Sequence, residues 1–402
     1  MAFLRSDLAQ FAAYSAPHPD PHSDQQAPEK KIDGLDTNES PIDLPPALKA
    51  ALAQQYEQII EANRYPDGSH AELKQAIAQY AIASSNIAPE TLTLKNITLG
   101  NGSDELIRSL IMATCLGGEG AILVSDPTFS MYAILAKTLG VPVHTVSRKE
   151  NFEVDIAQAE VAIDTAQKEG SAPVKVIFMV HPNSPTGNAL TQLELDWLKQ
   201  LSTDILIVVD EAYFEFSGHT TLAEALSRPN WIVTRTFSKA FRLAAHRVGY
   251  GIAHPSIIAA LEKLRLPYNL PTFSQAAALT ALGHSEQLLE QIPTILDERN
   301  KLLHRLSEHD CLRVWPSDSN FIYARLSDRG LSTLGVSEQA DGLKKVFQQL
   351  RSRGTIIRHT GGGLRISIGT PPENQRTLSN IQSVLSKESN TTIEPVAATL
   401  SH

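Results

Sequence analysis

Cysteine is scarce in this sequence, which has only Cys115 and Cys311 among its 402 residues. The two are far apart and belong to no Cys-x-x-Cys or Cys/His pattern. We therefore expect neither a disulfide framework nor a structural zinc site, and no bound metal. This cysteine usage fits a reducing compartment.

Long apolar runs and an excess of basic residues are absent as well. The longest aliphatic run, Ile205–Val209, is strand-sized and far shorter than the roughly 20 residues of a membrane span. The N-terminus has no apolar core of the kind found in signal peptides. A net charge of −9 argues against nucleic acid or an anionic membrane as the main partner. These absences predict a cytoplasmic protein.

The length exceeds what one hydrophobic core usually serves, so we expect one large and one smaller domain. We place the large domain at residues 35–285, whose first part, 35–60, can pack with the small domain at 286–385. Residues 1–34 are rich in Pro, His, Gln and Ala and form either a disordered tail or an arm on a partner subunit. Residues 386–402 are polar and predict a flexible tail.

Continuous aliphatic runs alternate with helical segments along most of the chain. Such runs are typical of a parallel sheet covered by helices on both faces, so the predicted fold class is α/β. The expected strands of the large domain are 97–99, 121–125, 141–146, 174–180, 205–209 and one that begins at Trp231. The expected helices are 46–60, 70–83, 104–115, 132–139, 190–201, 254–266 and a long one at 285–309. The smaller α+β domain is expected to contain strands 321–325, 355–358 and 364–368 and a helix at 340–353.

The stretch Trp231–Gly249 places a lysine directly after a predicted strand. A β-branched run is followed by Ser238 and Lys239, and Arg247 comes eight residues after the lysine. Ligands of α/β sheets bind at the carboxyl ends of the strands. A lysine shielded there from water can have its pKa lowered enough to act as an amine nucleophile. Lys239 is therefore the leading catalytic candidate.

Two other predicted strands also end in polar loops. Asn183 follows the strand at 174–180, and Asp210 and Tyr213 follow the strand at 205–209. If these strands are parallel neighbours, their loops converge with Lys239 on one crevice. A lysine that forms an imine with an aldehyde cofactor needs a carboxylate that keeps the pyridine nitrogen protonated, and donors near the ring oxygen. Asp210 can supply the carboxylate, and Asn183 with Tyr213 the donors.

The phosphate of such a cofactor would need an anion-binding cradle. Gly102, Ser103 and Asp104 begin a predicted helix, where free backbone amides can bind an anion. Ser238 and Arg247 can add side-chain donors.

Each of these residues also has a purely structural interpretation. Asp210 can cap the following turn, and Asn183 between two prolines is typical of a turn. Arg247 can be a solvated charge or part of an ion pair, and Tyr65 and Phe129 can be packing aromatics. The occurrence of the polar residues together, in order and at strand ends, favours the chemical interpretation.

A set of motifs carries a family resemblance from about Leu35 to about residue 380. They are GNGSDE, PTF-S-MY, HPNSPTG, DEAY, SKAFRLAAHRVGY and LRISIG. The sequence resembles the fold type I pyridoxal-phosphate aminotransferases and, within them, the histidinol-phosphate aminotransferase subfamily. The resemblance implies a three-layer, aspartate aminotransferase-like large domain with a mainly parallel sheet, and pyridoxal 5'-phosphate as the cofactor.

The resemblance also implies roles for individual residues around the cofactor. Lys239 would form the Schiff base and shuttle the proton, and Asp210 would pair with the pyridine nitrogen. Phe129 would stack on the ring, where many relatives have tyrosine. The remaining cofactor contacts would come from Asn183 and Tyr213 at the ring oxygen, and from Ser238, Arg247, Gly102, Ser103 and Asp104 at the phosphate.

Four further residues take roles from the resemblance alone. Tyr65 would reach the cofactor phosphate of the other subunit, which implies a homodimer. Arg358 and Arg365 would bind the anionic group of the substrate, a task that suits the planar guanidinium. Asn38 would also contact the substrate.

The implied reaction belongs to histidine biosynthesis. It interconverts L-histidinol phosphate and 2-oxoglutarate with imidazole acetol phosphate and L-glutamate by transfer of one amino group. Three alternatives remain open from sequence: an aromatic amino-acid aminotransferase, a decarboxylase of a phosphorylated amino acid with the same fold, and a non-catalytic ligand sensor. The partners implied are a small-molecule amino donor and a keto acid.

Two departures from the family pattern stand out. His181 occupies a position where relatives usually have Asn. Arg242 and His246 replace smaller or apolar residues of many relatives, and either shape substrate choice or face solvent.

Overall fold

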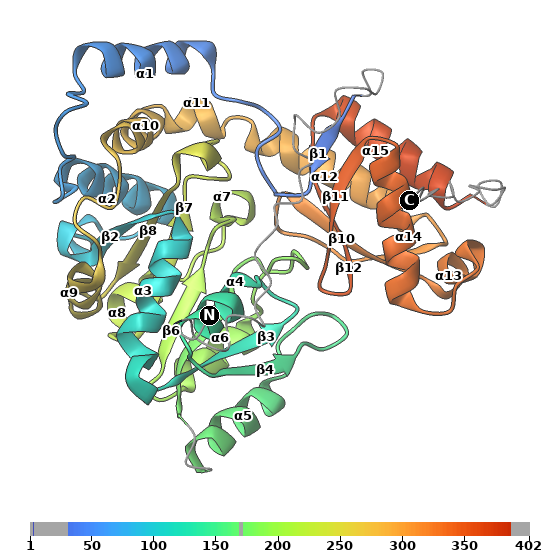
Figure 1. Cartoon of the computed structure of the whole chain (residues 1–402), viewed down its shortest axis with the longest axis horizontal. Helices are drawn as coiled ribbons and strands as arrows, with labels where there is room; N and C mark the ends of the chain where they lie inside the picture. Colours follow the sequence, from blue (N-terminus) through green and yellow to red (C-terminus); the bar gives the residue numbers. More distant parts are fainter. Residues whose placement is uncertain (1–2, 4–30, 169–171, 387–402) are drawn as a thin grey trace.

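The computed structural model describes residues 3, 31–168 and 172–386, and its two β-sheets lie side by side along the long axis of the molecule (Figure 1). Most of the arm expected at residues 1–34, and the tail after residue 386, lie outside the described residues. Within the described ranges, no helix is both long and apolar enough to cross a membrane.

The larger sheet has seven strands in the order β2-β8-β7-β6-β5-β3-β4. Strands β3 to β7 run parallel, and β8 is antiparallel to both of its neighbours. The strands are β2 (Ile97–Asn101), β3 (Ala121–Asp126), β4 (Val143–Ser147), β5 (Val174–Val180), β6 (Leu206–Asp210), β7 (Trp231–Thr236) and β8 (Val248–Ala253). The mainly parallel sheet expected from the aliphatic runs is confirmed.

Helices cover both faces of this sheet, which explains why its strands are apolar without interruption. Along β3, Ile122 and Val124 pack in one core cluster with helices α3 and α4, whereas Leu123 between them packs in a second cluster on the other face. The helices of this part are α1 (Pro46–Gln58), α2 (Ala71–Ser85), α3 (Ser103–Cys115), α4 (Met131–Thr138), α5 (Ile156–Lys168), α6 (Gln192–Gln200), α7 (Phe214–Ser217), α8 (Leu222–Ser227), α9 (Pro255–Leu264) and α10 (Thr272–Gly283).

The smaller sheet has five strands in the order β1-β11-β12-β10-β9. Its edge strand β1 comes from the beginning of the described chain and pairs in parallel with β11, so residues 36–39 lead from this sheet back to the larger one. The strands are β1 (Asp33–Leu35), β9 (Leu312–Val314), β10 (Phe321–Leu326), β11 (Thr355–Thr360) and β12 (Gly363–Ser367). The helices of this part are α12 (Ile292–Ser307), α13 (Asp328–Leu334), α14 (Gln339–Ser352) and α15 (Pro371–Val384). The short helix α11 (Ser285–Leu289) lies beside α10, and its Leu288 packs in the second core cluster of the larger part (Figure 1).

Several elements differ from the sequence-based expectation, and two of them bear on the path of the chain. The single helix expected at 285–309 is two helices, because α11 ends at Leu289 and α12 begins at Ile292 with Pro293 in its first turn. Proline is preferred at the start of a helix and disfavoured inside one. Strand β8 was not expected, since it contains Gly249 and Gly251. A Cβ at Gly249 would lie 2.6 Å from the backbone nitrogen of Ser103, so glycine lets β8 approach the start of α3.

Candidate active site

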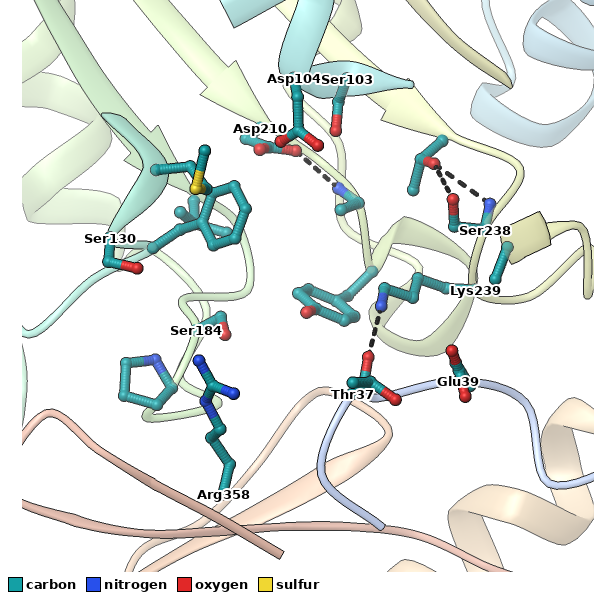
Figure 2. Close-up of a pocket in the computed structure, with 18 of the residues that line it drawn as sticks. Thr37, Glu39, Ser103, Asp104, Ser130, Ser184, Asp210, Ser238, Lys239 and Arg358 are labelled. Atoms are coloured by element: carbon teal, nitrogen blue, oxygen red, sulfur yellow. Dashed lines mark hydrogen bonds between the residues drawn. The ribbon is translucent and has the colours of Figure 1, made fainter. Parts of the chain in front are cut away.

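A cavity of about 590 Å³ lies at the carboxyl ends of the parallel strands and is lined by residues of both sheets (Figure 2). Its walls are the loops after β2, β3, β5, β6 and β7, the segment 36–39, and the hairpin formed by β11 and β12. The predicted convergence of three strand ends on one crevice therefore occurs, since β5, β6 and β7 are parallel neighbours.

Lys239 reaches the cavity from the turn after β7. Its Nζ donates a hydrogen bond to the carbonyl oxygen of Thr37 at 2.7 Å (Figure 2). Burial lowers the pKa of the Lys239 amine below its ordinary value. A lowered amine pKa is what a nucleophilic lysine requires, because only the neutral form attacks a carbonyl group.

Asp210 is the last residue of β6, and its side chain is buried. Its Oδ2 accepts a hydrogen bond from the phenol of Tyr132 at 2.8 Å, and its Oδ1 accepts one from the backbone N–H of Ala212 at 3.1 Å. Burial raises the pKa of this carboxyl to about 6. Within residues 31–168 and 172–386, no side chain forms an ion pair with Asp210. The cavity therefore has a buried carboxyl group that suits a cationic N–H of a ligand.

Tyr213 also lines the cavity, and its hydroxyl accepts a hydrogen bond from Nδ2 of Asn38 at 2.9 Å. Asn38 itself is 1% exposed and does not line the cavity. Its Oδ1 accepts a hydrogen bond from the hydroxyl of Ser367. The expected contact of Asn38 with substrate is therefore not supported by its position, which instead fixes the phenol of Tyr213.

Asn183 and Ser184 are neighbours in the loop after β5, but only Ser184 lines the cavity. Asn183 is 1% exposed and bonds to protein groups on all sides. The position of Asn183 does not support the role expected for it at the cofactor ring, because its amide does not face the cavity.

The start of α3 forms one end of the cavity, where Ser103 and Asp104 line the wall together with Ser238 and Arg247. Nη1 of Arg247 donates to Oγ of Ser238 at 3.3 Å, and its Nη2 pairs with Asp104 at 3.2 Å. Gly102 has a φ of +73°, and a Cβ there would lie 2.5 Å from Nη2 of Arg247. A glycine, a helix N-terminus and a guanidinium group thus meet at one point, an arrangement suited to a phosphate.

Arg358 and Arg365 lie directly opposite each other on β11 and β12, and both line the cavity. Arg365 is fixed by hydrogen bonds from Nη1 to Oγ of Ser184 at 3.0 Å and from Nη2 to the carbonyl oxygen of Asp36 at 2.6 Å. Two guanidinium groups from the small-sheet side therefore line the same cavity as Lys239, where they can bind the anionic groups of a substrate.

Besides Tyr213, two aromatic residues were expected at the site, and they lie in different places. Phe129 lines the cavity and contacts Tyr132 edge-on, with the ring centroids 5.5 Å apart. Tyr65 is 81% exposed, stacks on Tyr268 at 4.7 Å, and does not line the cavity of its own chain.

Arg242 and His246 do not line this cavity but a second one of about 280 Å³ beside α1. The guanidinium of Arg242 donates to the carbonyl oxygens of Asp43 and Leu288, and the ring of His246 lies against Phe273. Their contacts are with protein groups, which argues against direct contact with a substrate in the main cavity.

These groups fit pyridoxal phosphate. The buried carboxyl of Asp210 suits the pyridine nitrogen, Lys239 suits the aldehyde, and the glycine cradle at the start of α3 suits the phosphate.

Comparison with known proteins agrees with this geometry. The sequence pattern of the family described as "Aminotransferase class I and II" matches residues 30–381. The chain therefore belongs to the class I and II aminotransferases. This aminotransferase is 57% identical over 385 residues to "Histidinol-phosphate aminotransferase" of Trichodesmium erythraeum, covering 95% of this chain and 99% of that protein. It is 56% identical to "Histidinol-phosphate aminotransferase 2" of a Nostoc species, covering 96% and 98%.

The fold agrees with solved structures as well. A histidinol-phosphate aminotransferase from Sinorhizobium meliloti, solved in complex with pyridoxal-5'-phosphate, superposes with a TM-score of 0.73 at 23% identity, over 88% of this aminotransferase and 91% of that chain. The aspartate aminotransferase-like fold expected from the motifs is confirmed.

Several residues of the site, among them Tyr132 and Ser184, were not predicted from the sequence. Tyr132 was included only in a motif, although it lies three residues after Phe129 and so falls on the same side of the start of α4. Ser184 was included only in the motif HPNSPTG, and the neighbouring Asn183 was predicted instead.

Proposed function

We propose that this protein is a pyridoxal-phosphate-dependent aminotransferase that interconverts L-histidinol phosphate and 2-oxoglutarate with imidazole acetol phosphate and L-glutamate. The observation that carries the proposal is the identity of more than half of all residues, over nearly the full length, to proteins named for this reaction. The cavity supports it, because two arginines can bind either a phosphate ester or the distal carboxylate of glutamate.

The cofactor, when bound, supplies an electron sink for the carbanion that forms at the substrate carbon. The chain would hold it through Lys239, with Asp210 at the pyridine nitrogen and the start of α3, Ser238 and Arg247 at the phosphate. The desolvated amine of Lys239 is suited to take and return the substrate proton, since its pKa is lowered toward the working pH. Arg358 and Arg365 orient the substrate so that its reacting carbon faces this amine.

The proposal is tested with purified protein loaded with pyridoxal phosphate. L-Histidinol phosphate and L-glutamate should each discharge the visible absorbance of the lysine-bound cofactor rapidly, and L-phenylalanine slowly. Lys239→Ala should lack that absorbance. Equal or faster discharge by phenylalanine would assign an aromatic amino-acid aminotransferase instead, and absence of cofactor absorbance with Lys239 intact would refute the cofactor assignment.

The proposal includes a homodimer in which Tyr65 completes the site of the other subunit. Its support is the exposure of Tyr65 and of the nearby Ile59, Leu266 and Tyr268, four large apolar side chains that water would otherwise meet. A mixture of Tyr65→Ala and Lys239→Ala subunits tests this arrangement. In a mixed dimer, one site has Lys239 from the first subunit and Tyr65 from the second, so activity should return on mixing. No return after exchange of subunits would contradict it.

We also place the reaction in the cytoplasm. The two buried, unpaired cysteines, Cys115 and Cys311, support a reducing compartment.

A further inference from the structure

The two arginines on the small-sheet side of the cavity share one face of that sheet with a tyrosine. Tyr323 on β10 lies directly opposite Arg365 on β12, and Arg365 lies directly opposite Arg358 on β11. Residues paired in this way point to the same face of a sheet. The hairpin of β11 and β12 thus carries both arginines, and Arg358 extends from it toward the cavity (Figure 2). The position of this hairpin therefore sets where the two guanidinium groups lie.

The turn of the hairpin is made of glycine and has no side chains of its own to hold it. Thr360 and Gly363 pair across the turn, so Gly361 and Gly362 form a two-residue loop, with φ values of +60° and +71°. Glycine adopts this turn conformation without strain. Glycine also loses more conformational freedom on folding than other residues do. Contacts from outside the turn are therefore needed to hold it in one place.

Strand β10 supplies two such contacts, both to the same atom. The ring of Tyr323 lies so close to Gly363 that a Cβ there would clash with the phenol, and the Tyr323 hydroxyl donates a hydrogen bond to the carbonyl oxygen of Gly361. Nη2 of Arg325 donates to the same carbonyl oxygen at 3.1 Å. A carbonyl oxygen has two lone pairs, and here both are used by side chains of β10.

The turn also rests on loops of the larger sheet. A Cβ at Gly361 would lie 2.7 Å from Cβ of Pro127, which follows β3, and 2.9 Å from Cγ of Pro185, which follows β5. The guanidinium of Arg325 forms a second link, because it lies 5.2 Å from the ring centroid of Phe152, which follows β4. A cation at this distance from an aromatic ring is attracted to it. The turn is therefore held between its own sheet and the loops of the other one.

We propose that Tyr323 is a positioning residue for substrate binding, which acts by holding the turn at Gly361 against the larger sheet. The turn in turn sets the distance from Arg358 and Arg365 to Lys239. Tyr323 does not line the cavity, so it acts without touching the substrate. This inference rests on the proposed function, because it concerns the anionic groups of the substrates of that reaction. The groups proposed to hold the cofactor come from the larger sheet, so loss of the Tyr323 hydroxyl should weaken substrate binding and spare cofactor binding.

The Tyr323→Phe variant tests this, because it removes the hydroxyl and keeps the ring. In the holoenzyme, single-turnover discharge of the cofactor absorbance gives a limiting rate and a half-rate concentration for each substrate separately. For L-histidinol phosphate and for L-glutamate, the half-rate concentration should rise by about 5- to 10-fold, the size of one lost hydrogen bond. The limiting rate and the Kd for pyridoxal phosphate should change by less than about twofold, as expected when only substrate binding is weakened.

A second variant disturbs the same contact from the other side. Gly361→Ala places a methyl group against Pro127 and Pro185 and should move the turn away from the larger sheet. It should raise the half-rate concentrations as Tyr323→Phe does. The matched control is Tyr80→Phe, which also removes one phenol hydrogen bond, to Glu215 at 3.0 Å, but from a residue outside the cavity. Tyr80→Phe should leave the half-rate concentrations unchanged.

Three results would overturn the inference. They are unchanged half-rate concentrations in Tyr323→Phe, an equal rise in Tyr80→Phe, and a loss of cofactor affinity in Tyr323→Phe as large as the loss of substrate affinity. A wild-type holoenzyme whose absorbance L-histidinol phosphate does not discharge would overturn the proposed function instead, so the two failures are distinguishable.

Discussion

The phenol of Tyr132 donates a hydrogen bond to Oδ2 of Asp210 across 2.8 Å, and both side chains are buried. The Tyr132 ring is stacked on Phe178 of β5, with centroids 4.5 Å apart, so the phenol has little freedom to move. Burial raises the pKa of Asp210, and this hydrogen bond opposes that rise because it stabilises the carboxylate. Tyr132 thus keeps an ionised carboxylate available at the floor of the cavity.

Replacing Tyr132 with phenylalanine should therefore weaken cofactor binding. The ring still stacks on Phe178, but the Asp210 carboxylate loses a hydrogen bond of the charge-assisted type, worth about 1.5–3 kcal/mol. We expect the Kd for pyridoxal phosphate to rise by roughly 10- to 100-fold at pH 8. Absorbance titration of the apoenzyme measures it. An unchanged Kd would show that Asp210 does not need the phenol.

Replacing Asp210 with asparagine should stabilise the apoenzyme while abolishing activity. The pKa of Asp210 is raised from 3.8 to about 6, so the folded protein retains a proton that the unfolded chain releases between these values. Stability therefore falls as the pH rises through this window and stays lower above it. Asparagine keeps the shape without the charge, so above pH 6 the variant should be more stable by up to about 3 kcal/mol.

Urea unfolding of the two apoenzymes at pH 4 and pH 8 checks this expectation. The midpoints should be similar at pH 4 and should separate at pH 8, with the variant higher. A lower midpoint for Asp210→Asn at pH 8 would mean that the ionised carboxylate is satisfied in the empty site.

The position of the cavity could be predicted from the sequence, because it follows from local features of the strands and of the residues directly after them. Aliphatic runs identify buried parallel strands, and the polar residues that follow them, Asp210 and Lys239, must then lie at one edge of the sheet. Sequence reasoning selected Asn183, whereas Ser184 lines the cavity, since the path of the turn after β5 decides which of two successive side chains faces the cavity.

Residues whose role comes from distant partners were also beyond sequence reasoning. In the sequence, Tyr132 looks like an ordinary core aromatic residue. Its contact with Asp210 is seen only in the fold, because the two residues are 78 positions apart in the chain. Asn38 comes close to Tyr213 because β1 joins the smaller sheet and returns the chain past the cavity. Long-range pairing of this kind leaves no local signal in composition or periodicity.

A buried histidine far from the chemistry should set the stability of the protein at acid pH. His70 is 1% exposed, and neither of its ring nitrogens has a hydrogen-bond partner within the described ranges. Burial lowers its pKa from 6.5 to about 4, so between these values the unfolded chain binds a proton that the folded protein does not. Stability should therefore fall as the pH drops from 6.5 toward 4, by up to about 3 kcal/mol.

His70→Asn isolates this contribution, because asparagine tolerates the positive φ of 53° found at this position. The variant should lose less stability than the wild type between pH 6.5 and pH 4.5, as measured by urea unfolding. His304→Asn, at an exposed histidine of α12, is the control and should follow the wild type. Parallel curves for all three proteins would refute the assignment to His70.

A buried ion pair joins the end of β6 to β7, close to Asp210. Arg235, on β7, and Glu211, directly after Asp210, have 1% and 0% exposed side chains and lie 2.9 Å apart. Removing the cation leaves Glu211 buried without its ion-pair partner, so Arg235→Met should reduce the free energy of unfolding by about 3–5 kcal/mol. The double variant Glu211→Gln/Arg235→Met should be less damaged than this single variant, because it buries no lone charge.

The exposed pair Arg313–Glu150 provides the comparison that separates burial from charge. Its side chains are 52% and 78% exposed, so Arg313→Met should change stability by less than about 1 kcal/mol. If the Arg235–Glu211 ion pair holds β6 and β7 in the positions that bring Asp210 and Lys239 together, Arg235→Met should also bind pyridoxal phosphate more weakly than Arg313→Met does. Equal cofactor affinity in both variants, despite a large difference in stability, would show that the Arg235–Glu211 ion pair stabilises the fold without positioning the site.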